Sequence, residues 1–380
     1  HNREPGAPWL RGIGYHPCVA GDIDRDWLDH HIPDRPVRIQ HRGGRLWVCN
    51  SRALRELGVP GSDSPTGLER VEGRPTGRLY DEDRWLRARL HSQLPRLGGA
   101  SQLLARYGVT GITDTSPGNG EAEWSYFHQS QLDGQLLQRV RMMGSAGIRA
   151  CRETERLQQG EFKVHLLESS LPEFDSLCRD IAAAHASGRG VAIHCVSHTE
   201  LVYALSAWQS AGARPGDRVE HASVTPPELL QSIQELGLRV VTQPHFIAER
   251  GDEYLTDVDS RDLPWLYRAA GFITAGIPLA GGSDAPFGDP DPWVAMRAAV
   301  ERRTRSGRVV APTEALTPRQ ALSLFLSRPE APGINPAQLA IGDRADLCLL
   351  DAPWREVRDE LSSAHVRATW VAGGLIYQAG

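Results

Sequence analysis

The sequence predicts an α/β fold, with a (β/α)8 barrel of the TIM type and a small, partial β-sandwich domain. From about residue 100, short β-like runs alternate with helical stretches, which is the pattern of a parallel α/β architecture. The runs recur about every 30 residues, as the units of such a barrel do. The helical stretches also carry glycine directly after their ends, a position that favours it.

The predicted strands of the barrel are seven runs rich in β-branched and apolar residues. They span residues 108–114, 139–145, 162–168, 190–194, 217–221, 238–244 and 277–284. Because a barrel has eight units, this count predicts an eighth strand, either before residue 1 or unrecognised within residues 1–100.

Helices are predicted between the runs at residues 171–187, 199–211 and 226–236. The first has Pro172 near its start, where the missing amide hydrogen costs nothing. Each is followed by a glycine that can end the helix in the left-handed conformation.

The predicted domains are a cap or insertion over the barrel at residues 1–99, the hydrolase barrel at residues 100–335, and C-terminal strands of the small β-domain at residues 336–380. Within the first, strands are expected at 36–40 and 45–49 and a helix at 50–57. Within the last, strands are expected at 345–350, 365–372 and 375–378, the last two joined by a hairpin turn at Gly373-Gly374.

Composition limits the classes of partner. The chain is 40% hydrophobic and 23% charged with a net charge of −5, and it has no block of basic residues, so neither nucleic acid nor a membrane surface is expected. No run approaches the roughly 18 apolar residues of a membrane helix. Six scattered cysteines favour a reducing compartment, and we expect a cytoplasmic location, although a signal peptide before His1 stays open. A homodimer is the default assembly.

Four polar residues stand where predicted barrel strands end. Lys163 lies in the third run, His194 and His221 end the next two, and Asp284 ends the last in the stretch GGSDAPFGDPDPW. The spacings between them correspond to one, one and two barrel units, and functional side chains of such barrels lie at the carboxyl ends of the strands. All four residues are therefore expected at one mouth.

Each of these residues has a structural alternative. A histidine at a strand end can donate to a backbone carbonyl, Lys163 could pair with Glu161 or Glu168, and Ser283-Asp284 is ordinary turn chemistry. Together they favour a metal site, since imidazole and carboxylate are good ligands of Zn²⁺. A desolvated lysine with a lowered pKa can take up CO₂ and become a carbamate, which resembles a carboxylate and can bridge two metals.

The chain resembles the metal-dependent amidohydrolase superfamily, and within it amidohydrolase family 3, which includes N-substituted formamide deformylase-like enzymes. The resemblance spans nearly the whole chain and depends on the order of short blocks. These are residues 8–14 (PWLRGIG), 33–37 (PDRPV), 47–54 (WVCNSRAL), 108–110 (GVT), 218–221 (RVEH), 242–244 (TQP), 282–286 (GSDAP), 314–317 (EALT), 320–322 (QAL) and 342–347 (GDRADL).

The resemblance implies roles for the four residues. Lys163 is similar to the strand-four lysine, His194 and His221 to the ligands of strands five and six, and Asp284 to the strand-eight aspartate. In that family the aspartate binds metal, acts as general base toward the activated water, and passes the proton to the leaving nitrogen. The first barrel strand of the family carries His-x-His, which this sequence lacks; the resemblance suggests that it lay upstream of His1.

Three further histidines are candidates for substrate binding. His165 shares a strand face with Lys163, and a packed interior histidine is its alternative. His198 and His245 follow two of the predicted strands, where substrate contacts are common. Cys195 faces away from His194 on the same strand and is interpreted as a core residue.

The sequence therefore predicts a metal-dependent hydrolase that cleaves an amide-type C–N bond of a small molecule, N-acyl, N-formyl or cyclic, with one or two divalent metals, Zn²⁺ in the first place. Two alternatives stay open. One is a mononuclear deaminase on the same barrel, against which Lys163 argues. The other is a non-catalytic binding protein or an incomplete fragment, which the missing His-x-His favours.

Overall fold

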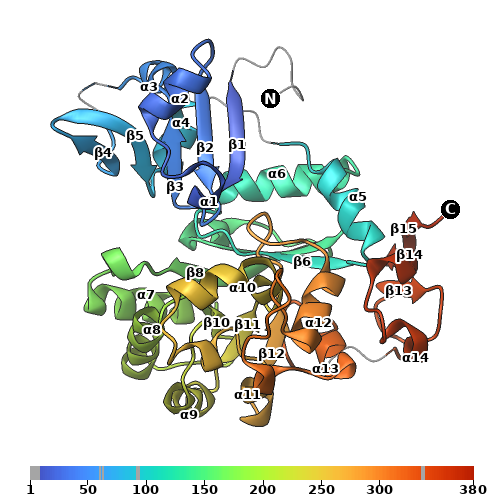
Figure 1. Cartoon of the computed structure of the whole chain (residues 1–380). Coiled ribbons are helices and arrows are strands. Elements are labelled where there is room, and N and C mark those ends of the chain that lie inside the picture. The colour runs from blue at the N-terminus through green and yellow to red at the C-terminus, as the bar shows by residue number, and fades with distance from the viewer. Residues whose placement is uncertain (1–8, 60, 62–63, 91–94, 335–338) are drawn as a thin grey trace. The chain divides into compact units, whose positions relative to one another are not determined.

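A computed structural model describes residues 9–59, 61, 64–90, 95–334 and 339–380, apart from the side chain of residue 84 (Figure 1). The chain divides into two compact units, residues 1–95 and 96–380. Each unit has hydrophobic clusters of its own. The predicted boundary at residues 335 and 336 lies outside the described residues, as do the first eight residues of the sequence.

The first unit is built on a five-stranded sheet in the order β1-β2-β3-β5-β4, in which β1 and β2 are parallel and the other pairs antiparallel. Its strands are β1 (Leu10–Tyr15), β2 (Val37–His41), β3 (Leu46–Cys49), β4 (Leu68–Val71) and β5 (Arg74–Tyr80), and its helices are α1 (Pro17–Ala20), α2 (Arg25–His31), α3 (Ser51–Glu56) and α4 (Asp83–Arg89). The two strands and the helix expected between residues 36 and 57 are β2, β3 and α3. Asn50 caps α3 by accepting from the amide of Ala53.

The second unit contains a seven-stranded parallel sheet whose order, β12-β11-β10-β9-β8-β7-β6, follows the chain without a break. The strands are β6 (Gly111–Asp114), β7 (Arg139–Gly144), β8 (Leu157–His165), β9 (Val191–Cys195), β10 (Arg218–His221), β11 (Arg239–Thr242) and β12 (Leu279–Gly281). Each lies within or overlaps one of the seven predicted runs. The α/β class with a TIM-type parallel sheet is thereby confirmed.

The sheet is a curled half-barrel rather than a closed ring (Figure 1). Among the described residues, no strand joins β12 to β6. If β8 is the fourth strand of the barrel, as the resemblance implies, then β6 is the second and β12 the eighth. The open position is therefore that of the first strand, to which the resemblance assigns the His-x-His motif.

Helices connect most of the strands and cover the outer face of the sheet (Figure 1). They are α5 (Gly98–Arg106), α6 (Glu121–Leu132), α7 (Phe174–Ala186), α8 (His198–Ala211), α9 (Pro227–Glu235), α10 (His245–Asp257), α11 (Ala270–Thr274), α12 (Pro292–Glu301) and α13 (Pro318–Ser323), with 3₁₀ turns at Ala146–Ala150, Glu168–Ser170, Leu263–Trp265 and Pro312–Glu314. The three predicted helices are α7, α8 and α9. The glycines after them, Gly188, Gly212 and Gly237, all have positive φ, as a left-handed helix end requires.

The main core lies between the sheet and these helices. Ile193, Val219 and Val240 from β9, β10 and β11 face Trp208 of α8 and Phe272 of α11, and all five are 0% exposed. Because this core holds the strands in register, it also fixes the relative positions of the side chains at their carboxyl ends.

A three-stranded antiparallel sheet, β13-β14-β15, ends the chain. It consists of β13 (Leu347–Leu350), β14 (Val366–Val371) and β15 (Gly374–Gln378), with α14 (Trp354–Val357) and a 3₁₀ turn (Ser363–His365) between the first two. The hairpin residues Ala372 and Gly373 both have positive φ, as the tight turns of β-hairpins require. Thr369 of β14 donates to the carbonyl of Ala105, which docks the sheet on α5.

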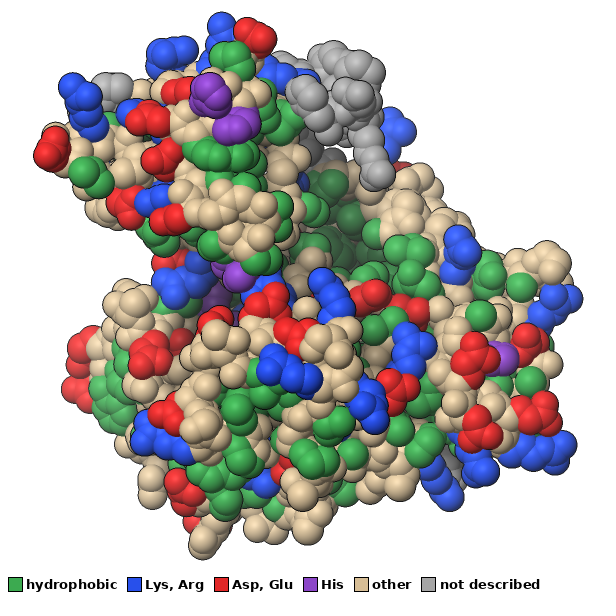
Figure 2. Space-filling model, in the orientation of Figure 1, with side chains coloured by type: hydrophobic (Ala, Val, Ile, Leu, Met, Phe, Trp, Pro, Cys, Tyr) green, Lys and Arg blue, Asp and Glu red, His purple; other side chains and the backbone are tan. Residues whose placement is uncertain are grey.

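Charges of both signs are mixed over the visible face of the molecule (Figure 2). No helix among the described residues combines the length and the apolar character that crossing a bilayer would need.

Candidate active site

The four residues that the sequence places at one mouth come from β8, β9 and β10 and from the turn after β12. Lys163 and His165 lie at the carboxyl end of β8, next to β9, where His165 is paired with His194. On the other side of β9, His194 is paired with Glu220 and Cys195 with His221 of β10. Asp284 follows β12, which is reached from β10 through β11. All four therefore lie at the carboxyl edge of one sheet.

Three histidine rings form a continuous row along this edge. The ring centroids of His165 and His194 are 4.2 Å apart, and those of His194 and His221 are 4.4 Å apart, each pair edge to face. His221 is buried, His194 is half-buried and His165 is exposed. The row thus runs from the interior of the mouth toward solvent.

The backbone turns His221 into the mouth. On β10, Glu220 and His221 are consecutive, so a regular strand would send their side chains to opposite faces. His221 instead has φ of 69° and the next residue, Ala222, has φ of 47°, both in the left-handed region. Non-glycine residues adopt this region at a cost, and such strained residues cluster at functional sites. Here the turn allows His221 to contact His194.

Gln243, directly after β11, fixes the orientation of His221. The Nδ1 atom of His221 lies 2.7 Å from Oε1 of Gln243, and Gln243 is 3% exposed. The amide oxygen can only accept, so the imidazole proton lies on Nδ1 and Nε2 keeps its lone pair. Burial first, and the nearby Lys163 second, lower the pKa of His221 to about 4, so the ring is neutral. This role of Gln243 is not evident from the sequence, in which its position directly after a barrel strand is the available signal.

Lys163 is buried, with 7% of its surface exposed. Burial lowers the pKa of its amine, while the carboxylate of Glu220 opposes that shift. No hydrogen bond or ion pair joins it to the described residues. The nearby charges are already paired, Arg218 with Glu220 at 2.6 Å and Arg141 with Glu161 at 3.1 Å. Lys163 is also the sole lysine of the 380-residue chain, in which arginine supplies every other basic side chain besides histidine.

Asp284 lies on a turn with unusual backbone geometry. Its φ is 51°, and the side chain is partly buried. Burial raises the pKa of its carboxyl to about 6, against the attraction of Arg250 and Lys163. A carboxylate with a pKa near neutrality can both accept and release a proton at physiological pH.

The three predicted substrate-binding histidines have different surroundings. His165 belongs to the histidine row, and His198 is exposed at the first turn of α8. His245 is 0% exposed, and its Nε2 lies 3.0 Å from the carbonyl oxygen of Ser283. Substrate binding by these residues stays a prediction. Cys195 is buried beside the helices, among the residues of the main core.

The donors at the mouth suit a divalent cation in chemical type. Two imidazoles, a carboxylate and a lysine with no hydrogen bond or ion pair to the described residues match the preferences of zinc-like ions. The fixed tautomer of His221 supplies a ready lone pair. In the described part of the chain, however, no three ligand atoms of His165, His194, His221 and Asp284 lie within 4.8 Å of one another. The side chains would therefore have to move closer together around an ion.

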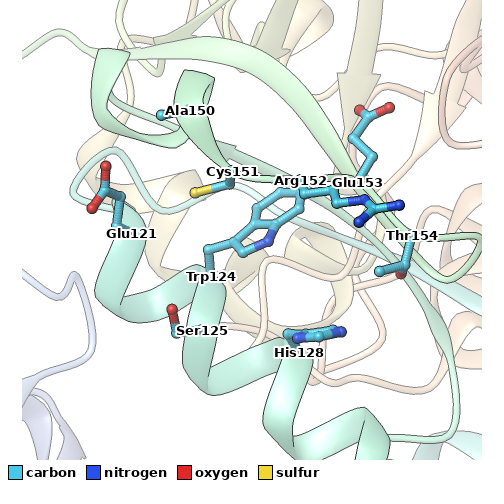
Figure 3. Close-up of a pocket in the computed structure, with 9 residues that line it drawn as sticks. All are labelled: Glu121, Trp124, Ser125, His128, Ala150, Cys151, Arg152, Glu153 and Thr154. Carbon is cyan, nitrogen blue, oxygen red and sulfur yellow. The ribbon is translucent and has the colours of Figure 1, made fainter.

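A separate open pocket of about 700 Å³ lies between α6 and the segment after β7 (Figure 3). Trp124 and His128 of α6 face Cys151 and Thr154 across it. None of the predicted site residues lines this pocket, so its chemistry is distinct from that of the mouth.

A curled parallel sheet with a lysine, histidines and an aspartate at its carboxyl edge has the arrangement in which barrel enzymes carry their active sites. Residues 9–377 match the amidohydrolase family, and the chain belongs to that family. The chain is 24% identical over 447 aligned positions to the amidohydrolase YtcJ of Bacillus subtilis. The alignment covers 98% of this chain and 80% of that protein. The chain is 25% identical over 441 positions to the N-substituted formamide deformylase of Arthrobacter pascens, again with 98% and 80% covered.

Among solved structures, the fold is similar to that of an uncharacterised metal-dependent hydrolase from Pyrococcus horikoshii. The TM-score is 0.65 at 22% sequence identity, with 84% of this chain and 71% of that chain covered. A similarity at this level of identity concerns the fold.

Proposed function

We propose that this protein is a metal-dependent hydrolase that cleaves an amide-type C–N bond of a small molecule. The observation that supports it best is the position of Lys163, His194, His221 and Asp284 at the carboxyl edge of one sheet, with the tautomer of His221 fixed by Gln243. Membership of the amidohydrolase family supports a divalent metal, and Zn²⁺ suits the donors.

His194, His221 and Asp284 would hold the cation, together with Lys163 as its carbamate. The carbamate forms when a neutral amine adds to CO₂ and releases a proton. The burial that lowers the pKa of Lys163 favours the neutral amine that this addition needs. When bound, a divalent cation polarises the substrate carbonyl and lowers the pKa of water.

Asp284 would transfer a proton from the attacking water to the leaving nitrogen. Its carboxylate accepts a proton from the attacking water as the new C–O bond forms, and then gives that proton to the nitrogen as the C–N bond breaks. The products are a carboxylic acid and an amine, and Asp284 is left ionised as it began. Its position on the turn directly after β12, at the mouth of the sheet, suits both steps.

The test is the metal content of the protein after preparation with Zn²⁺ and bicarbonate. We expect one or two metals per chain in the wild type and a large loss in Lys163→Ala. His128→Ala is a matched control, because His128 lines the separate pocket of Figure 3 and should leave the metal content unchanged. Near-zero metal in both the wild type and Lys163→Ala would overturn the proposal.

The sole lysine allows a second, direct readout. Protein prepared with ¹³C-bicarbonate should show one carbamate carbon signal by NMR, which should be absent in Lys163→Ala. Assays on N-formyl, N-acyl and cyclic amides would then define the bond that is cleaved. Ammonia release from aminopurines, with one tightly held metal and no action on amides, would instead indicate a deaminase.

A further inference from the structure

Helix α10 holds the segment that contains Asp284 at three points. We call residues 282–291 the Asp284 loop. His245, Glu249 and Arg250, from the first two turns of α10, contact Ser283, Asp289 and Phe287 of that loop. The first contact is a side chain bonded to the residue directly before Asp284.

His245 acts as a buried donor in this arrangement. Its Nε2–H donates to the carbonyl oxygen of Ser283 at 3.0 Å, and its buried Nδ1 has no hydrogen-bond partner among the described residues. The ring is 0% exposed, and burial lowers its pKa to about 4, so it is neutral with the proton on Nε2. A ring enclosed in this way contacts the loop and not the solvent at the mouth.

The contact fixes a peptide plane. The carbonyl of Ser283 and the amide nitrogen of Asp284 belong to one rigid peptide unit. A hydrogen bond to that carbonyl therefore constrains the position of the Asp284 amide nitrogen and, through it, of the Asp284 Cα. Asp284 has φ of 51°, a conformation that the surrounding structure has to enforce in a residue with a side chain.

Glu249 and Arg250 make the other two contacts between α10 and the Asp284 loop. The carboxylate of Glu249 accepts from the amide of Asp289 at 2.9 Å, and the guanidinium of Arg250 donates to the carbonyl of Phe287. Arg250 also stacks over the ring of Phe246, with its central carbon 4.0 Å from the ring centroid, which holds the guanidinium in place. The loop is thus held on both sides of Asp284.

Gly288 shows that the loop and the helix are closely fitted. A Cβ atom at this position would lie 2.6 Å from the Ser283 carbonyl oxygen and 2.7 Å from Cε1 of Phe246, and it would also collide with Nε2 of His245. Any side chain at this position would displace His245 or the Ser283 carbonyl, so the hydrogen bond between them needs a glycine at 288. The close fit of the loop to His245 is thus seen from the loop as well as from the helix.

We infer that His245 is a positioning residue, which through the Ser283 carbonyl places the Asp284 carboxylate at the mouth of the sheet, with Glu249 and Arg250 in support. The hydrogen bond between His245 and Ser283 does not depend on which reaction the protein catalyses. Its effect on metal binding by Asp284 rests on the proposed function. This role differs from the substrate contact predicted for His245 from the sequence.

The experiment compares His245→Leu, His245→Gln and Gly288→Ala with the wild type. Leucine removes the donor at similar size, and glutamine restores an N–H of similar reach. The first readout is hydrogen exchange of the peptide spanning residues 283–290 in metal-free protein. We expect faster exchange in His245→Leu and Gly288→Ala and near-normal exchange in His245→Gln.

The second readout is the affinity for Co²⁺, followed by its visible spectrum. We expect binding about 10- to 100-fold weaker in His245→Leu and Gly288→Ala, as for other residues that orient metal ligands, with recovery in His245→Gln. Glu249→Ala and Arg250→Ala change partly exposed positions and serve if the buried variants fail to fold, and each should raise exchange in the same peptide.

Asp252→Asn is the matched control on the same helix. Asp252 accepts from Thr304 and Ser306, away from the Asp284 loop, so its loss tests whether any weakening of α10 gives the same result. We expect an unchanged exchange rate at 283–290 and an unchanged Co²⁺ affinity.

The outcomes separate the two proposals. Unchanged exchange and unchanged Co²⁺ affinity in His245→Leu would overturn the positioning role and leave the proposed function intact. Faster exchange in His245→Leu, together with no Co²⁺ binding by the wild type, would support the contact and contradict the proposed function. Equal effects in Asp252→Asn and His245→Leu would also overturn the positioning role.

Discussion

Individual residues at the mouth could be predicted where the sequence pattern points to the end of a strand. His194, His221 and Asp284 each end a β-rich run and Lys163 lies within one, and the parallel sheet places all four at its carboxyl edge. Their roles as ligands stay a prediction until metal is measured.

Contacts between side chains from different segments could not be predicted in this way. The bond of Gln243 to His221 depends on a positive φ at His221, and β-strand alternation alone would send that ring to the other face. The bond of His245 to Ser283 depends on how α10 packs against a loop almost forty residues further along the chain.

Gln243 offers a test of the fixed tautomer. Replacing it by leucine leaves Nδ1 of His221 without an acceptor, so the ring can reorient or change tautomer. We expect Zn²⁺ affinity, measured by competition with a chelator, to fall about 10- to 100-fold. Gln243→Glu keeps an acceptor oxygen at the same reach and should lose much less. Equal affinity in Gln243→Leu and the wild type would contradict this role.

At the scale of elements, apolar runs in the sequence correctly predicted that the seven strands of the sheet exist. They predicted less accurately where each strand begins and ends. Strand β8 begins at Leu157, five residues before the predicted run, because its polar residue Glu161 is buried against Arg141 inside the sheet. A search for apolar runs passes over such a segment. Strand β12 is shorter than its run, since Pro278 has no amide hydrogen and Asp284 turns away with positive φ.

Helix α8 should depend strongly on Trp208. This side chain is 0% exposed and packs in the main core behind β9 and β10. We expect Trp208→Ala to lower the free energy of unfolding by about 3–5 kcal/mol, because it leaves a cavity and removes buried apolar surface. Val202→Ala on the exposed side of the same helix should change it by less than about 0.5 kcal/mol, as chemical denaturation can show. Similar losses in both variants would contradict the assigned core.

The C-terminal sheet should show a pH-dependent stability through His365. Nδ1 of His365 is 2.8 Å from a carboxylate oxygen of Asp351, and Nε2 is 3.2 Å from one of Glu360. Both hydrogen bonds raise the pKa of the imidazole, and the bond to Asp351 has the larger effect. A raised folded pKa gives stability that is complete below the unfolded pKa and is lost as the pH rises through the folded pKa.

Accordingly, we expect His365→Gln to destabilise the protein more at pH 6 than at pH 9, as measured by urea unfolding at each pH. In a background that also carries Asp351→Asn and Glu360→Gln, the difference between the two pH values should disappear. A loss that is the same at both pH values would show that His365 acts by packing alone.

At the scale of the whole molecule, residues 96–380 contain the half-barrel, its helices, the C-terminal sheet and all the candidate ligands. The unit has its own main core. We therefore expect the fragment 96–380 to unfold cooperatively and to bind Zn²⁺ with the stoichiometry of the full chain. The measurements are circular dichroism during heating and elemental analysis. A fragment that lacks a cooperative transition would show that residues 1–95 are needed for the fold.

The role of residues 1–99 as a cap over the barrel stays a prediction. The sequence pattern identified its strands β2 and β3 and its helix α3, because local signals such as the Asn50 cap specify short elements. A cap function depends on which surface the unit covers, and such long-range packing leaves no periodic pattern in a sequence.

The single lysine has a consequence for the reactivity of the protein. Aldehydes and anhydrides modify aliphatic amines, and beyond the amino terminus of the chain they would find one target, a side chain that is 7% exposed. All surface cations of the Lys/Arg type are guanidinium groups, which such reagents attack poorly near neutral pH. The rate at which an amine-directed label enters the protein would therefore report how often the mouth of the sheet opens to solvent.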